Sequence, residues 1–169
     1  MVKVLHAADF HLDSAFGALP EEKARLRRRE SRRIPARLVE WANDHGAQLM
    51  LLAGDLFDSD NLYGQTAQEL ADALGRFRGR VFIAPGNHDF YAAHGPWGAA
   101  AWPENVHIFT SGRPVCVDEP ELGCAVWGLS LIHISEPTRP SGARPSLRRR
   151  RRTAARSRRC AAPTTGART

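Results

Sequence analysis

Side chains of the kinds that bind metal ions follow three short apolar runs, at the point where each run ends. The three groups are Asp9 with His11, Asp55 with Asp58, and Asn87 with His88 and Asp89. Carboxylate, amide and imidazole ligands together suit Mn²⁺, Fe or Zn²⁺ better than Ca²⁺. A central carboxylate can bridge two ions about 3.5–4 Å apart, which together activate a water and neutralise a phosphate. The pattern therefore predicts a site for two divalent ions.

Each group also has an ordinary structural interpretation. An Asp-x-His pair is common by chance, and Gly-Asp after a strand is common in turns. The Gly-Asn-His-Asp string at 86–89 is harder to explain as a turn alone, because a buried His and Asp need partners. All three groups in order, each at a strand end, favour one shared site.

The runs before these groups have the pattern of buried strands. We expect strands at 2–5, 49–53, 81–84, 106–109, 114–117 and 124–127. The run at 49–53 is apolar throughout, which is typical of a central strand covered on both faces. Strands that alternate with helices indicate a layered α/β domain with a parallel sheet. Functional sites gather at the carboxyl ends of such strands.

Helices are expected between the strands, over about 20–45 with a break at Pro35, and over 62–77. Apolar residues at near-helical spacing predict the buried side of each helix. They are Leu26, Ile34, Leu38 and Trp41 in the first segment, and Leu70, Ala73, Leu74 and Phe77 in the second.

The three groups resemble the first three signature blocks of the calcineurin-like metallophosphoesterase superfamily. The longer strings at 5–14, 51–58 and 84–91 are similar to its bacterial DNA-repair exonuclease branch, the SbcD-like nuclease subunits. The resemblance covers about residues 1–128. It implies the N-terminal part of a four-layer αββα fold, and phosphodiester hydrolysis that depends on two divalent ions, Mn²⁺ by preference.

The resemblance also implies a role for each matching residue. The metal ligands are Asp9 and His11 at the first ion, Asp55 as the bridge, and Asn87 at the second ion. His88 lies beside the scissile phosphate, where it stabilises charge or protonates the leaving oxygen. Asp58 and Asp89 orient the ligands from behind.

Later blocks of the superfamily supply three further imidazoles, one of them in a lone-His block and others in a Gly-His-x-His string. That string does not occur in this sequence, and His133 is the only histidine after residue 128. Residues 129–139 resemble a translated sequencing adapter, so we do not assign His133 to the site. We expect the natural sequence to leave this reading frame near residue 128, and the truncated chain as written to be inactive.

Composition divides the chain at the same place. Residues 1–128 hold 13 basic and 17 acidic residues, a net charge of −4, whereas residues 129–169 hold 11 arginines and one acid, a net charge of +10. The second segment has no Trp, Tyr or Phe. We therefore expect a partial metallophosphoesterase domain over 1–128 and a non-native, disordered basic tail over 129–169. A genuine basic arm for nucleic acid is the rival interpretation of the tail.

The leading function is cleavage of DNA ends in repair, with DNA, a coiled-coil ATPase subunit and a second copy of the chain as expected partners. A phosphatase or a cyclic-nucleotide phosphodiesterase is the alternative enzyme, because these share the three blocks. A non-catalytic binding protein is the third hypothesis. Three cysteines, no signal peptide and no membrane-length apolar stretch favour the cytoplasm.

Overall fold

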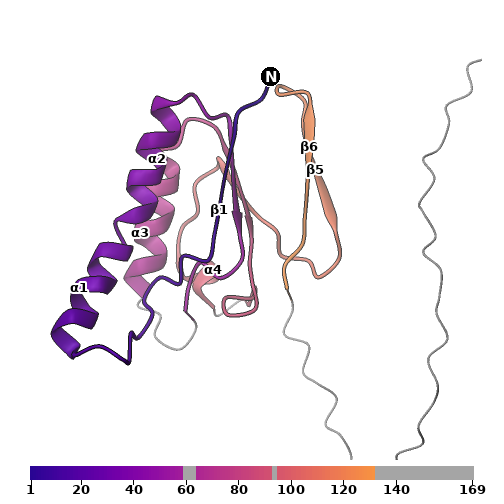
Figure 1. Cartoon of the computed structure of the whole chain (residues 1–169). Coiled ribbons are helices and arrows are strands. Elements are labelled where there is room, and N and C mark those ends of the chain that lie inside the picture. Colours follow the sequence, from indigo (N-terminus) through magenta and orange to yellow (C-terminus); the bar gives the residue numbers. More distant parts are fainter. Residues whose placement is uncertain (59–63, 93–94, 132–169) are drawn as a thin grey trace, which may run out of the picture. The chain divides into compact units, whose positions relative to one another are not determined.

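The computed structural model describes residues 1–58, 64–92 and 95–131, which belong to one compact unit, Met1–Ile134. Its centre is a parallel sheet with strand order β1-β2-β3-β4 (Figure 1). The strands are β1 Val4–Ala8, β2 Leu49–Ala53, β3 Arg80–Ala84 and β4 Val106–Ile108. The predicted parallel α/β architecture is confirmed.

Three longer helices lie on one face of this sheet and an antiparallel hairpin lies on the other (Figure 1). The helices are α1 Glu21–Ser31, α2 Ile34–Asp44, α3 Gly64–Gly75 and the short α4 Pro96–Ala99. The hairpin consists of β5 Val115–Glu119 and β6 Cys124–Gly128. The described residues thus form a helix layer, a sheet and a second sheet, which are three of the four layers expected.

Strand β2 is central to the core because its two faces contribute side chains to two different hydrophobic clusters, one on each side of the sheet. Met50 and Leu52 pack with the helices, whereas Leu49 packs with Phe82 and Phe109 beneath the hairpin. Met50 is 0 % exposed and Leu52 1 %. Side chains alternate across a strand, so an unbroken apolar run is what a strand covered on both faces requires.

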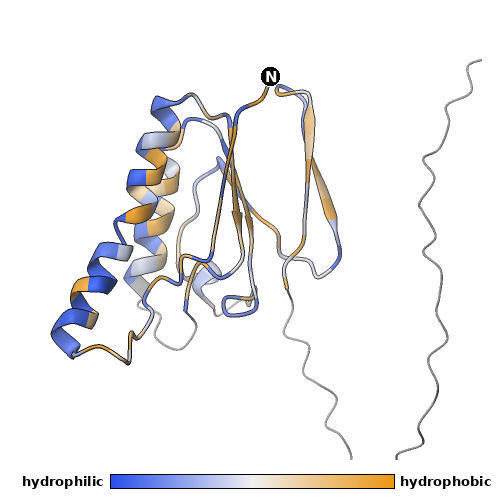
Figure 2. Cartoon of the chain, in the orientation of Figure 1, coloured by the Kyte–Doolittle hydropathy of each residue, from blue (hydrophilic) through white to orange (hydrophobic). Residues whose placement is uncertain are grey.

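The helix break at Pro35 is confirmed, but the predicted buried side of this region is wrong at three of four positions. Leu26, Ile34 and Trp41 are 55 %, 49 % and 54 % exposed. Helix α1 ends at Ser31 and α2 begins at Ile34. Pro35 lies in the first turn of α2, where a backbone N–H would have no partner within the helix, so its missing N–H costs no hydrogen bond. A single helical period therefore does not run through the segment, and α1 presents a mostly polar surface (Figure 2).

Helix α3 follows the sequence prediction more closely. The four residues expected inward are all buried, namely Leu70, Ala73, Leu74 and Phe77. The predicted start of this helix, before Gly64, lies outside the described residues.

Beyond the predicted domain boundary at 128, the described chain stays packed as far as Ser130. This serine is 2 % exposed, and its backbone N–H donates to the carbonyl of Ser111 at 2.8 Å. The rest of the predicted tail, including His133, lies outside the described residues. The boundary and the disorder of the tail stay predictions. Within the described ranges, no helix has the length and apolar character to cross a membrane.

We predict an acid-dependent loss of stability that originates at His107 in β4. Its ring lies 5.7 Å from that of Phe82 and 4.8 Å from that of Phe109. Burial lowers the pKa of His107, Arg80 lowers it further, and Glu119 opposes both. The unfolded chain, with the ordinary pKa of 6.5, then binds the proton more readily than the folded chain. The stabilisation is therefore complete above that value and is lost as the pH falls through it toward the folded pKa.

Urea unfolding midpoints measured from about pH 8 to about pH 5 test this prediction. We expect the midpoint of His107→Phe to fall less on acidification than that of the unchanged chain, because phenylalanine keeps the ring packing and cannot be protonated. The prediction would be contradicted if the urea midpoints of the two proteins fell equally as the pH is lowered.

Candidate metal centre

The loops that leave β1 and β2 remain bonded to each other after the strands end. The backbone N–H of Asp9 donates to the carbonyl of Gly54 at 3.1 Å, and that of His11 donates to the carbonyl of Asp55 at 2.9 Å. The residues predicted as ligands are therefore held in register by backbone bonds between the two loops.

Three of the predicted ligands converge at this edge of the sheet. One ligand atom from each of Asp9, His11 and Asp55 lies within 4.8 Å of the other two. Asp9 is exposed, whereas His11 and Asp55 are partly buried. Two carboxylates and an imidazole that meet at one point, open to solvent on one side, fit a divalent ion of the Mn²⁺, Fe or Zn²⁺ kind.

The backbone at these three residues is left-handed. The φ angles are +55° at Asp9, +43° at His11 and +48° at Asp55. Asp and His enter this region more readily than most residues, yet each position still costs about 1 kcal/mol. Unfavourable backbone angles that coincide with converging polar side chains are typical of functional sites. The strain is consistent with a backbone selected to aim these side chains rather than for local stability.

The loop after β3 reaches the same point through Gly86 and His88. The backbone N–H of His88 donates to Oδ1 of Asp55 at 3.0 Å. A Cβ atom at Gly86 would overlap both the carboxylate and the backbone nitrogen of Asp55. Only glycine therefore permits the β3 loop to lie against the predicted bridging residue.

In this loop the predicted ligand Asn87 and the predicted catalytic residue His88 are both exposed. The His88 ring lies 5.5 Å from the His11 ring and nearly perpendicular to it, so it borders the ligand cluster. Asn87 precedes His88 in the same turn. Its assignment to a second ion, and the catalytic role of His88, stay predictions.

Asp89 lies behind the cluster and is 2 % exposed. Its Oδ2 accepts the backbone N–H of Leu56 at 2.8 Å and that of Phe57 at 3.3 Å, while its Oδ1 accepts that of Gly86 at 2.6 Å. Burial raises the pKa of Asp89, the three backbone bonds lower it, and nearby Asp55 raises it. One carboxylate thus joins the loops after β2 and β3, and the role assigned to it, to orient Asp55 from behind, stays a prediction.

Asp58, the other residue predicted to orient ligands, is half-buried. Its backbone N–H donates to the carbonyl of Leu12 at 3.0 Å, which extends the bonding between the β1 and β2 loops. The role assigned to its carboxylate stays a prediction.

Sequence reasoning missed Asp13, which is 0 % exposed and has a φ of +66°. Its Oδ1 accepts from Nη2 of Arg32 at 2.6 Å. The signal was an aspartate two residues after a predicted ligand, in a stretch packed against the core. Its partner could not be found from spacing, because Arg32 lies 19 residues further on.

We predict that Asp89→Asn destabilises the fold and loosens the candidate metal centre. In the unchanged protein both carboxylate oxygens of Asp89 accept backbone N–H groups. In either orientation of the asparagine, its NH₂ group therefore faces at least one backbone N–H that has lost its acceptor. A buried donor left without its acceptor costs about 1–3 kcal/mol, which urea unfolding measures. The matched control is Asp72→Asn at an exposed position of α3, where Oδ1 accepts from Gln68. Equal loss in the two variants would show that Asp89 has no special structural role.

Comparison with known proteins agrees with this geometry. A family model described as calcineurin-like phosphoesterase matches residues 2–141. The chain is 38% identical over 116 residues to a protein of Bacillus subtilis (strain 168) named uncharacterized metallophosphoesterase YhaO. That match covers 65% of this chain and 28% of the relative. A putative phospholipase B-like 3 of Caenorhabditis elegans is 38% identical over 63 residues, which are 37% of this chain and 11% of that protein.

These matches leave the chain spanning about a quarter of the length of the bacterial relative. The family to which the model refers hydrolyses phosphoesters with divalent metal ions, and the Asp9–His11–Asp55 cluster is a donor set of that kind. Because the family model covers most of the sequence, the chain belongs to the calcineurin-like phosphoesterase family.

Proposed function

We propose that this domain, within a protein of the length of its bacterial relative, hydrolyses phosphodiester bonds in DNA with two divalent ions, Mn²⁺ by preference. The observation that carries the proposal is the convergence of Asp9, His11 and Asp55 at the carboxyl edge of the sheet. Bound ions of this kind lower the pKa of a water and neutralise a phosphate.

Asp55 is the best-placed residue to bridge the ions. Its carboxylate lies between the β1 loop, which carries Asp9 and His11, and the β3 loop, whose His88 N–H bonds to its Oδ1. That bond orients the carboxylate, and the remaining lone pairs of both oxygens stay available. Asn87 follows Gly86 in the β3 loop, and its amide oxygen is the ligand proposed for the second ion.

His88 is proposed as the residue that acts on the phosphate. Its ring is exposed and borders His11, so a substrate at the ligand cluster would lie within its reach. An imidazolium there stabilises charge on the phosphate or gives a proton to the leaving oxygen. The Asp89 carboxylate, bonded to the backbone of the loops on either side, keeps this arrangement in place.

DNA is the proposed substrate because the strings around the three motifs resemble the DNA-repair exonuclease branch. A phosphatase or a cyclic-nucleotide phosphodiesterase has the same donor set, and the name of the bacterial relative supports only the broader class. The non-catalytic hypothesis is less favoured, since the ligand residues converge under backbone strain. Turnover of a DNA duplex, compared with that of a phosphomonoester and a cyclic nucleotide, separates the enzymes.

The proposed partners are DNA, a coiled-coil ATPase subunit and a second copy of the protein, acting in the cytoplasm. All of them rest on the resemblance, and purification of the longer protein with its bound partners tests them.

We predict that residues 1–169 bind Mn²⁺ weakly, hold fewer than two ions at saturation and do not turn over a phosphodiester. The described residues offer three converging donors, and such a site in this family needs further imidazoles. Asp9 and Asp55 then lie close together with too little positive charge between them. Mn²⁺ electron paramagnetic resonance gives the stoichiometry. Asp55→Ala should abolish binding, whereas Asp118→Ala on exposed β5 should not.

Two tightly bound ions, or turnover of a phosphodiester by residues 1–169, would overturn this part of the proposal. Either result would also make His133 and its neighbours part of the native protein.

We predict that His88→Ala, made in the longer protein, lowers kcat by about 100-fold or more and leaves Mn²⁺ affinity unchanged. The reason is that its proposed role is toward the phosphate and not toward the ions. His45→Ala is the control, because this exposed histidine stacks on Trp41 away from the ligand cluster. An unchanged rate in His88→Ala would remove the assignment, and a loss of Mn²⁺ would make His88 a ligand.

A further inference from the structure

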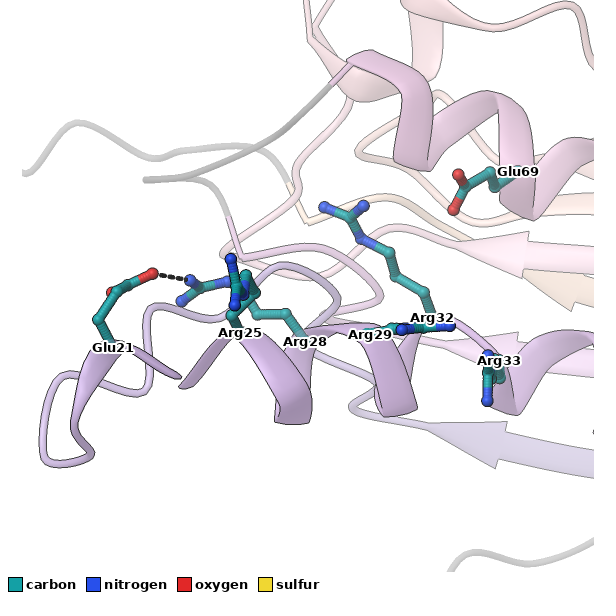
Figure 3. Close-up of a pocket in the computed structure, with 7 residues that line it drawn as sticks. All are labelled: Glu21, Arg25, Arg28, Arg29, Arg32, Arg33 and Glu69. Carbon is teal, nitrogen blue, oxygen red and sulfur yellow. Dashed lines mark hydrogen bonds and ion pairs between the residues drawn. The ribbon is translucent and has the colours of Figure 1, made fainter. Parts of the chain in front are cut away.

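A strongly basic cavity lies beside α1, outside the ligand cluster. Its volume is about 530 Å³. The residues that line it are Glu21, Arg25, Arg28, Arg29, Arg32, Arg33 and Glu69 (Figure 3). Figure 3 shows the arginines following one another along α1 and the turn after it, with Glu69 on α3 across from them. We call this surface the arginine cavity.

The charge of the arginine cavity is opposite to that of the domain around it. Five arginines and two glutamates give the lining a net charge of +3, whereas residues 1–128 as a whole carry −4. Positive charge gathered on one concave surface of an acidic domain raises the local concentration of anions there.

Two of the arginines are fixed by partners and connect the cavity to the metal loop. Arg28 donates to Glu21 at 2.7 Å and to the carbonyl of Ala15 at 3.1 Å. Arg32 is bonded to buried Asp13 at 2.6 Å. Asp13 and Ala15 belong to the same loop as the ligand His11. The arginine cavity therefore adjoins the segment that leaves the candidate metal centre.

The other three arginines have no carboxylate partner among the described residues, and all three are exposed. They are Arg25, Arg29 and Arg33. Their spacing of four residues places them on one side of the helical path, because the backbone stays in the right-handed helical region through Arg33. Glu69 alone does not neutralise three guanidinium groups.

The length of this row indicates the kind of anion that it fits. From Arg25 to Arg33 the helical path rises about 12 Å at 1.5 Å per residue. Successive phosphates of a DNA strand lie several ångströms apart along the backbone, so a row of this length can contact more than one of them. A single small phosphate would instead require guanidinium groups that converge on one point.

We propose that the arginine cavity binds the backbone phosphates of a DNA strand whose scissile phosphate lies at the metal centre. This proposal deepens and rests on the proposed function. The fixed pair Arg28 and Arg32 shapes the surface, and the row Arg25, Arg29 and Arg33 contacts phosphates. Backbone contacts of this kind position a duplex without reading its sequence.

The test measures DNA binding by residues 1–169 in EDTA. Fluorescence anisotropy of a labelled duplex gives the binding constant at several salt concentrations. The cavity variant is Arg25→Gln/Arg29→Gln/Arg33→Gln, since glutamine removes the charge and keeps a high helix propensity. The control variant is Lys23→Gln/Arg27→Gln/Arg113→Gln, which removes equal charge outside the cavity lining. Both variants keep the basic segment 129–169, so any binding by that segment is common to them. Circular dichroism checks that both remain folded.

We expect the cavity variant to weaken DNA binding by about tenfold or more, and to reduce the slope of log K against log salt by about 2 to 3. The control variant should lie close to the unchanged protein. Equal weakening in both variants, or no weakening in either, would overturn the proposal. Tripolyphosphate binding that the cavity variant loses while it keeps DNA binding would also overturn it, and would assign the cavity to a small phosphate anion.

The two proposals fail separately. EDTA removes metal ions, so the DNA-binding result does not depend on the metal centre. Loss of Mn²⁺ binding in Asp55→Ala concerns the proposed function alone.

Discussion

The buried carboxylate of Asp89 is the contact on which the candidate metal centre depends. Parallel strands bring their carboxyl ends to one edge, but they do not fix the loops that follow. Asp89 accepts backbone N–H groups from the β2 loop at Leu56 and Phe57 and from the β3 loop at Gly86. Gly86 in turn lies directly against Asp55. Asp89 is not itself a proposed ligand. Its bonds nevertheless hold together the two loops that carry the proposed ligands Asp55 and Asn87.

The proposed ligand residues do not favour the backbone conformation that they adopt. Asp9, His11 and Asp55 all have positive φ angles, which are energetically unfavourable for residues other than glycine. Bonds from Asp9 to Gly54 and from His11 to Asp55 offset this cost, because they continue the parallel ladder past the ends of the strands. The two loops are therefore held in register by backbone bonds that do not involve an ion.

The sequence predicted those parts of the fold that depend on local pattern. The inward face of α3 was predicted because burial on one side of a helix imposes a period, and strand 49–53 was predicted because a strand covered on both faces is apolar throughout. The convergence of Asp9, His11 and Asp55 followed from topology alone. Leu26 and Trp41 were assigned wrongly, since the helix restarts at Ile34 and the period with it. The Asp13–Arg32 ion pair is a contact between distant segments, and no local pattern contains it.

The electrostatics of the domain present a conflict that its geometry resolves. A centre built from carboxylates attracts cations and repels a polyanion, and residues 1–128 carry a net charge of −4. A polyanionic substrate would therefore meet an unfavourable field over most of this surface. Arg28 and Arg32, which line the arginine cavity, are bonded to Ala15 and Asp13 of the loop that carries His11, so the positive charge of the cavity adjoins that loop. Buried Asp13, in the loop that carries His11, forms an ion pair with Arg32 of the arginine cavity. This ion pair joins the acidic centre to the basic cavity. If the domain binds DNA as proposed, the separation of the two charges would let a single small domain bind cations and a polyanion side by side.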